Sequence, residues 1–181
     1  MRVQETIKMQ RDCLAVAVPS GQRVLIGKDG EVGLVQALGG SFTVKAQGRL
    51  YRIDGKDADA LGKTPLPPPQ LPHGATTADV EKLIWQQMRS CYDPEIPINI
   101  VDLGLIYRCE VSPLEDGGWQ VAVDMTLTAP GCGMGDILAS DVRQLILQVP
   151  EVKQAEVEVV FDPPWDASRM TEEARLATGM F

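Results

Sequence analysis

The stretch WQVAVDMTLT, residues 119–128, shows the strictest period-two alternation in the chain. Successive side chains of a β-strand point to opposite faces of the sheet, so every second residue shares a face. The alternation therefore predicts a strand with one apolar face and one more polar face. The apolar face is formed by Trp119, Val121, Val123, Met125 and Leu127, and the other by Gln120, Ala122, Asp124, Thr126 and Thr128.

Helix and strand patterns flank this stretch on both sides. Before it, Thr76 or Thr77 can cap a helix with apolar residues at helical spacing, namely Val80, Leu83, Ile84 and Met88. A strand at 105–111 follows, with Leu105, Tyr107, Cys109 and Val111 on one face. After it come a Gly-rich loop, a helix at 136–149, a strand at 155–161 and a short helix at 170–178. The order α-β-β-α-β predicts an α/β (α+β) fold, in which a three-stranded sheet has its helices packed on one face and ends in a right-handed parallel crossover.

Residues 1–62 have a different sequence pattern, in which glycines separate short runs of β-type residues. The runs are residues 13–18, 24–26, 31–38, 41–45 and 50–53. Five short strands without a helix predict a small all-β N-terminal domain, either a strongly bent sheet or a barrel.

Five prolines in the eleven residues 64–74 disfavour both helix and strand pairing. Such a segment adopts an extended conformation and is typical of a linker. The sequence therefore predicts three regions: an N-terminal domain at 1–62, a linker at 63–75 and an α/β domain at 76–181. The single histidine, His73, falls in the predicted linker, and we assign it no role.

Composition excludes several classes of protein. A net charge of −8, with no basic stripe, argues against nucleic acid as a partner. The N-terminus lacks the apolar region of a secretory signal, and the longest apolar run, residues 13–18, is about a third of a membrane span. We therefore expect a cytoplasmic protein that has no membrane partner and whose cysteines are thiols.

The four cysteines lack the spacing of a structural metal site, in which ligands come in pairs two to four residues apart. Seventeen residues separate Cys91 from Cys109, and 22 separate Cys109 from Cys132. The spacing argues against a preformed four-cysteine site within one chain, and it leaves open a labile site shared between two chains. Cys13 and Cys109 lie on predicted strands, where a free cysteine is commonly a core residue. For Cys91, which follows the first helix, structural and functional roles are equally compatible with the sequence.

Cys132 differs because it lies in the Gly-rich loop between a strand and a helix, which is where α/β folds place ligands. Gly131 and Gly133 remove side-chain cover around it. The N–H groups at the start of the following helix favour a thiolate, although Asp136 acts in the opposite direction. We expect Cys132 to be the functional cysteine. Asp93 and Glu95 are a second candidate pair, able to bind a cation or transfer protons, but an Asp-Pro-Glu sequence more often caps a turn.

Three segments resemble, in the same order, the motifs of a domain found in iron–sulfur targeting factors and in PaaD-like accessory proteins of oxygenases. They are CYDPEIPINIVDLGLIY at 91–107, TLTAPGC at 126–132, and FDPPW at 161–165 with SRMTE at 168–172. The resemblance covers about residues 78–178. The sequence QALGGSF at 36–42 is similar to the extension that marks the SufT subgroup.

The resemblance implies a non-enzymatic factor that acts in late Fe–S cluster assembly or transfer and uses Cys132. Its implied partners are Fe–S carrier or scaffold proteins and client apoproteins. Candidate ligands for a transient iron–sulfur cluster are Cys132 and Cys91, with Asp93 and Glu95 as a supporting site. A cluster normally needs four ligands, so one loop cysteine would have to share the cluster with a second protomer, a client or a small thiol.

Two alternatives remain open from the sequence. A thiol enzyme could use Cys132 as its nucleophile, but a base would have to be an Asp or a Lys because His73 is in the predicted linker. A PaaD-like accessory protein of an oxygenase would have the same α/β domain, and the SufT-like N-terminal extension disfavours it.

Overall fold

A computed structural model describes residues 3, 5–18, 20–38, 40–65, 67–93, 96–129 and 135–180, with the backbone alone at Leu38. The chain forms two compact units, Met1–Pro68 (unit 1) and Pro69–Phe181 (unit 2). Each unit has its own hydrophobic core.

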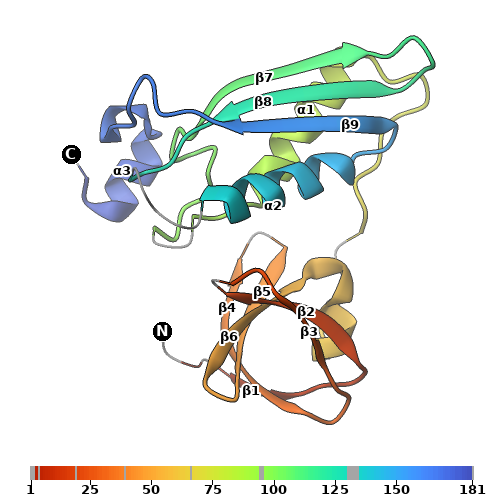
Figure 1. Cartoon of the computed structure of the whole chain (residues 1–181), viewed down its shortest axis with the longest axis vertical. Helices are drawn as coiled ribbons and strands as arrows, with labels where there is room; N and C mark the ends of the chain where they lie inside the picture. Colours follow the sequence, from red (N-terminus) through yellow and green to blue (C-terminus); the bar gives the residue numbers. More distant parts are fainter. Residues whose placement is uncertain are drawn as a thin grey trace. The chain divides into compact units, whose positions relative to one another are not determined.

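Unit 1 is a six-stranded antiparallel sheet that curls around its core (Figure 1). The strand order is β1-β4-β5-β6-β2-β3. The strands are β1 (Glu5–Lys8), β2 (Cys13–Val18), β3 (Arg23–Ile26), β4 (Glu31–Leu38), β5 (Ser41–Ala46) and β6 (Arg49–Asp54). The inward face buries side chains from most of these strands, including Ile7, Cys13, Val32, Val44 and Ile53. The prediction of a strand-rich N-terminal region is confirmed.

Two elements of unit 1 are absent from the sequence-based prediction. Strand β1 has a single inward apolar residue, Ile7, so its alternation is too short to be recognised. The 3₁₀ helix η1, Gly55–Leu61, contradicts the expectation of a region without helix. Its signals were present, because Asp54 caps its first turn and Gly62 ends it in a left-handed conformation.

Unit 2 has the predicted order of elements. They are α1 (Thr77–Met88), β7 (Ile106–Pro113), β8 (Trp119–Met125), α2 (Gly135–Leu147), β9 (Val152–Val159), η2 (Ala167–Arg169) and α3 (Glu172–Thr178). Strand β8 is central, antiparallel to β7 and parallel to β9. Helices α1 and α2 contact each other and share one core with the sheet (Figure 1). The α-β-β-α-β prediction is confirmed.

The apolar faces of α1 and β8 are the predicted ones, and α2 contributes to the same core. Thr76 caps α1 and forms a capping box with Asp79. The fully buried residues of these elements meet in one core: Val80, Ile84 and Met88 from α1, Val142 and Ile146 from α2, and Val121, Val123 and Met125 from β8. Among the described residues, no helix combines the length and the apolar character needed to cross a membrane.

A β-bulge changes the predicted face of β7. Ile106 pairs with Met125 and Arg108 pairs with Asp124, so Tyr107 has no opposite residue. Cys109 then pairs with Val123 on the core face, as predicted. The bulge means that Ile106, and not Tyr107, lies opposite the buried Met125, so the expected common face of Tyr107 and Cys109 is wrong.

Part of the Pro-rich segment packs on unit 2. Leu71 and Ala75 are partly buried against its hydrophobic core. The predicted linker, residues 63–75, therefore includes a stretch that contributes to the second core. The domain boundaries drawn from the sequence stay a prediction.

Candidate functional site

The turn after α1 contains two buried residues, Cys91 and Asp93. Cys91 is buried; its N–H donates to the Met88 carbonyl, and its carbonyl accepts from the Ile100 N–H. Asp93 is also buried, and its Oδ1 accepts from the Ile96 N–H at 2.8 Å. Asp93 thus stabilises the turn, which matches the structural role weighed from the sequence. Glu95 lies outside the described residues, so the predicted Asp93–Glu95 pair stays a prediction.

A second turn, residues 99–104, precedes β7 and is fixed by one asparagine. Asn99 Oδ1 accepts from the N–H groups of Val101 (3.1 Å) and Asp102 (2.9 Å), and its Nδ2 donates to Asp102 Oδ2 at 2.6 Å. The turn ends at Gly104, whose φ of +70° suits glycine. A Cβ on Gly104 would overlap the Arg169 carbonyl, so the chain at residue 169 passes directly over this turn.

The C-terminal segment is held on this turn by four contacts. Trp165 Nε1 donates to the Leu103 carbonyl at 2.8 Å, and the Thr171 N–H donates to the Asp102 carbonyl at 2.9 Å. The hydroxyl of Tyr107, at the bulge, donates to the Pro163 carbonyl at 2.9 Å. The Arg169 guanidinium lies 4.2 Å from the centre of the Tyr107 ring, a cation–π contact. The first and third sequence motifs therefore form one structure, which we call the motif clamp.

The motif clamp lies at the end of the sheet that is formed by the carboxyl ends of β8 and β9. Thr126, just after β8, donates its N–H to the Leu105 carbonyl, and Val160 donates to the carbonyl of Met125. At the start of α2, a Cβ on Gly135 would lie 2.8 Å from Leu127 Cδ1, so this helix starts in close contact with the strand end. Residues 130–134, including Cys132, lie outside the described residues. The last described residue before them, Ala129, follows the carboxyl end of β8, and the first described residue after them, Gly135, begins α2.

The three described cysteines lack the environment of a reactive thiol. Burial raises the pKa of the Cys13 thiol, with a smaller contribution from Asp57. Cys109 is partly buried against the core, and its pKa is raised to about 11, mainly by desolvation and also by Glu81. Cys91 is buried, so it offers no accessible thiol in this conformation. The core assignment holds for Cys13 and in part for Cys109. Within the described ranges, no group of three or more His, Cys, Asp or Glu residues could hold a metal ion.

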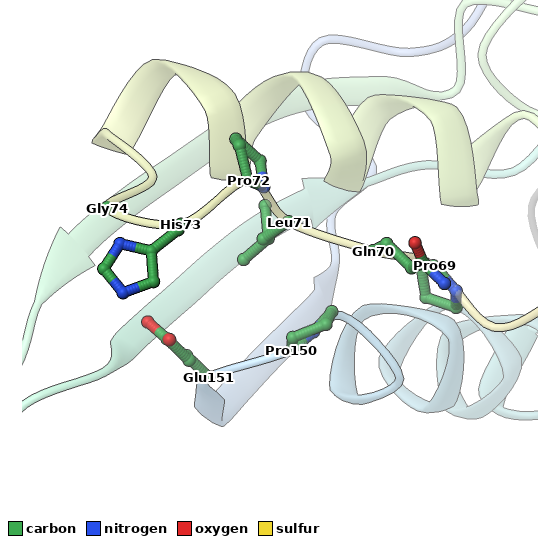
Figure 2. Close-up of a pocket in the computed structure, with 8 residues that line it drawn as sticks. All are labelled: Pro69, Gln70, Leu71, Pro72, His73, Gly74, Pro150 and Glu151. Atoms are coloured by element: carbon green, nitrogen blue, oxygen red, sulfur yellow. The ribbon is translucent and has the colours of Figure 1, made fainter.

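A shallow pocket of about 600 Å³ lies at the opposite end of unit 2 (Figure 2). It is lined by residues 69–74 with Pro150 and Glu151, and the side chains of His73 and Glu151 border the same open space. The Glu151 carbonyl accepts from the N–H of Trp119, the first residue of β8, whereas Cys132 follows the last. The pocket with His73 therefore lies at the opposite end of β8 from the motif clamp.

Sequence reasoning identified the segments of the motif clamp but not the roles of its side chains. Tyr107 was assigned to the core face, and Trp165 and Arg169 were quoted only as parts of a motif. A two-residue period cannot reveal a bulge, and contacts between residues about 60 positions apart leave no local signal.

Comparisons with known proteins give the same assignment for unit 2. Residues 81–159 match the family described as iron–sulfur cluster assembly protein. The chain is 44% identical over 99 residues to an Fe-S protein maturation auxiliary factor of Porphyromonas gingivalis, covering 55% of this chain and 90% of the relative. It is 41% identical over 88 residues to the Fe-S protein maturation auxiliary factor SufT of Staphylococcus aureus, covering 49% of this chain and 96% of that protein.

A solved structure supports the fold. A domain of unknown function from Bacillus anthracis is 35% identical, with a TM-score of 0.50, over 58% of this chain and 96% of that domain. With the shared fold, the matched motifs and these relatives, the chain belongs to the family of Fe–S protein maturation auxiliary factors.

Proposed function

We propose that the chain helps deliver Fe–S clusters to apoproteins without catalytic turnover, and that Cys132 is the residue that touches the cargo. The observation that supports this proposal is the motif clamp, which joins the first and third family motifs at the carboxyl end of β8, the strand that Cys132 follows in the sequence. The Fe–S cluster is cargo in this scheme and not a resident cofactor.

The chemistry of the other cysteines supports Cys132. A thiolate is the form of cysteine that ligates metal. The raised pKa values of Cys13 and Cys109 keep both as thiols at neutral pH. Cys91 is buried in the hydrophobic core of unit 2. One working thiolate per chain cannot satisfy a cluster that takes four ligands, so a client, a carrier or a second protomer supplies the rest.

The structure gives less support to a thiol enzyme. Such an enzyme needs a base within hydrogen-bond reach of its nucleophile. The single histidine of the chain, His73, borders the pocket at the opposite end of unit 2 (Figure 2). Asp93, the buried carboxylate near the motif clamp, accepts a hydrogen bond from the Ile96 N–H.

Complementation with serine variants tests the role of Cys132. In a strain that lacks the gene, Cys132→Ser should fail to restore the activity of an Fe–S-dependent enzyme, while the purified variant melts like the wild type. Cys109→Ser is the matched control. It places a hydroxyl against the core at a cost of about 1–3 kcal/mol if unpaired, so it should lower the melting temperature and still complement. Full complementation by a stably folded Cys132→Ser protein would overturn the proposal.

Alkylation mapping gives an independent measurement on the purified chain. At about pH 8, iodoacetamide should modify Cys132 first, because thiolate fraction and access set the rate. Cys109 should react slowly, with a rate that keeps rising toward its pKa of about 11. Cys13 and Cys91 should react only when the chain unfolds. Earlier modification of Cys109 than of Cys132 would contradict the assignment.

A further inference from the structure

The two edges of the unit 1 sheet differ in how they are protected. An edge strand presents unpaired backbone groups, and proteins usually cover it or place charged side chains along it. At the β1 edge, Lys8 pairs with Asp29 at 3.0 Å and Glu5 pairs with Lys63 at 3.2 Å. Ion pairs therefore protect the β1 edge from pairing with another strand.

The β3 edge carries exposed leucines instead. Leu14 on β2 and Leu25 on β3 lie directly opposite each other, and they are 59% and 60% exposed. Directly opposed side chains on adjacent strands touch, so the two leucines form one apolar patch. Within the described part of the chain, no strand pairs with the outer side of β3.

The backbone groups of β3 that point away from β2 belong to Arg23 and Leu25. The Ala17 N–H donates to the Gln22 carbonyl at 2.8 Å, which makes this pair a hydrogen-bonded position between β2 and β3. Hydrogen-bonded and non-hydrogen-bonded positions alternate along an antiparallel pair, so Arg23 and Leu25 occupy non-hydrogen-bonded positions. Among the residues that the structure describes, no backbone hydrogen bond outside the sheet involves either of them. Leu25 thus presents both free backbone groups and an exposed apolar side chain at this edge.

We propose that β3 is the interface of a weak homodimer, in which the β3 strands of two copies of the chain pair antiparallel about a two-fold axis. At the axis, Leu25 lies opposite Leu25 of the second copy, and their outward N–H and C=O groups form two hydrogen bonds. Arg23 lies opposite Gly27 of the second copy. Leu14 and Leu25 of both copies then form one row of four leucines across the joined sheets.

The side chains of β3 select this register. Directly opposite residues of an antiparallel pair point to the same face, so odd-numbered residues must lie opposite odd-numbered residues. Of the registers that satisfy this rule, pairing Leu25 with itself joins the two leucine patches, whereas pairing Arg23 with itself would oppose like charges. Val24 then lies opposite Ile26 of the second copy, and both are partly buried against the core of unit 1. A second copy therefore matches β3 on both faces and along its backbone.

The expected contact is small. It involves about five residues of each β3 edge and the leucine row, which is less than the roughly 1,200–2,000 Å² that a stable interface buries. The dimer should therefore be weak and should form only at high protein concentration.

Charge distinguishes this dimer from other ways in which two copies could associate. Residues 1–68 hold ten Lys and Arg residues against seven Asp and Glu residues, a net charge of +3. Residues 69–181 hold seven against 18, a net charge of −11. A contact between unit 1 of one copy and unit 2 of another would join opposite charges, and salt would weaken it. Pairing of β3 with β3 joins like-charged units, so salt should not weaken it.

A dimer has a consequence for cluster binding. A cluster held through Cys132 needs ligands from outside one chain, and a dimer holds two Cys132 residues in one assembly. This consequence rests on the proposed function, whereas the dimer itself does not.

Sedimentation equilibrium of the full chain with a reductant present, at about 10–500 μM, measures the association. We expect the average mass to rise with concentration toward that of two chains. Raising sodium chloride from about 50 mM to about 500 mM should leave the dimer unchanged or strengthen it. Leu25→Glu should weaken it by about tenfold or more, because two carboxylates would lie opposite each other at the axis. Leu176→Glu is the matched control, because Leu176 is equally exposed at 61% but lies in unit 2.

Disulfide trapping tests the register, in a Cys132→Ser background that removes the loop cysteine. Across a hydrogen-bonded antiparallel pair the Cα atoms lie about 5.5 Å apart, so Leu25→Cys should cross-link two chains under mild oxidation. Leu14→Cys is the matched control, because Leu14 is as exposed as Leu25 and lies on the same face. Three strand spacings, about 14 Å, separate residue 14 from its copy in the dimer. Cross-linking at residue 25 should therefore be about tenfold faster than at residue 14.

Three results would overturn the proposal. A monomer at every concentration would mean that a second copy does not cover β3. Weaker association at high salt would indicate that unit 1 contacts the oppositely charged unit 2 of another copy. Equal cross-linking at residues 14 and 25 would mean that the leucine patches stack face to face and that the strands do not pair. None of these measurements involves a cluster, so the dimer can fail independently of the role proposed for Cys132.

Discussion

Different kinds of interaction hold distant segments together within each of the two units. In unit 1, exposed ion pairs tie sequence-distant segments together, as where Arg11 contacts both Asp57 and Asp59 of η1. In unit 2, side chains of the motif clamp bind backbone carbonyls, as where Trp165 donates to Leu103. Exposed ion pairs contribute little to stability, whereas a close backbone approach tolerates almost no change. We therefore expect substitutions at the motif clamp to lower the stability of unit 2 more than substitutions at these ion pairs lower the stability of unit 1.

The two units also differ in net charge. The net charge of −8 for the whole chain conceals +3 in unit 1 and −11 in unit 2. The total charge argues against nucleic acid as a partner of the chain, and this argument is stronger for unit 2 than for unit 1. For a chain with two units, charge is informative only when it is assigned to each unit.

Gly104→Ala should give the largest effect. The substitution strains a backbone with φ of +70° and places a Cβ against the Arg169 carbonyl. Both costs add, so we expect unit 2 to lose about 2–4 kcal/mol of unfolding free energy. Urea unfolding followed by tryptophan fluorescence measures unit 2 alone, because it contains every tryptophan of the chain, Trp85, Trp119 and Trp165.

Gly74→Ala is the control for Gly104→Ala. Gly74 has a φ of +73°, but a Cβ on it would meet nothing within 4 Å. It should cost only about 1–2 kcal/mol, the penalty for the left-handed backbone. Equal losses for both glycines would show that the C-terminal segment does not press on the turn at residue 104.

The second prediction concerns where unit 2 begins. We expect the fragment 69–181 to unfold cooperatively on its own, because it has a separate core. A fragment that starts at residue 76 should be less stable by about 1 kcal/mol, since it loses the partly buried Leu71 and Ala75. Urea midpoints of the two fragments make the comparison. A molten 69–181 fragment would mean that unit 2 needs unit 1 to fold.

Trp165→Phe should destabilise unit 2 about as much as removal of residues 69–75, or less. The ring is largely retained, but the Leu103 carbonyl loses its donor, at a cost of about 0.5–1.5 kcal/mol. If the motif clamp positions the connection that holds Cys132, complementation should fall by more than this stability loss explains. Leu176→Ala on the exposed face of α3 is the control, and it should change neither measurement. Normal complementation by Trp165→Phe would limit the clamp to a structural role.

The sequence predicted unit 2 well and unit 1 less completely, for physical reasons. The alternation in β8 and the helical spacing in α1 reflect one buried face each, so local pattern was sufficient. Strand β1 is short, and its position in the sheet is fixed by pairing with β4, which is distant in sequence. The motif clamp likewise depends on contacts between residues far apart, such as Tyr107 and Pro163. The candidate thiol, Cys132, was chosen from its position in a Gly-rich loop and from the family resemblance, and it stays a prediction.

Arg11→Ala should give the smallest effect, confined to unit 1. Arg11 donates to Asp57 Oδ1 and to both carboxylate oxygens of Asp59, each at 2.7 Å. These hydrogen bonds lower the pKa of Asp59 below its ordinary value of 3.8. A carboxylate with a lowered pKa in the folded state stabilises the fold above its ordinary pKa, and the contribution is lost as the pH falls through the lowered value. Wild type should therefore be slightly more stable than the variant at pH 7, and the difference should vanish in acid.

The test of Arg11→Ala needs a spectroscopic probe of unit 1 and a matched ion pair in unit 2. Far-ultraviolet circular dichroism of the full chain follows both units, and tryptophan fluorescence identifies the part that belongs to unit 2. Arg108→Ala is the control, because Arg108 binds Asp124 at 2.7 Å, lowers its pKa, and lies in unit 2. Each variant should shift the acid transition of its own unit only, and added salt should reduce both shifts because the pairs are exposed. If Arg11→Ala altered the acid transition of unit 2, the two units would not unfold independently, and the contrast between them would fail.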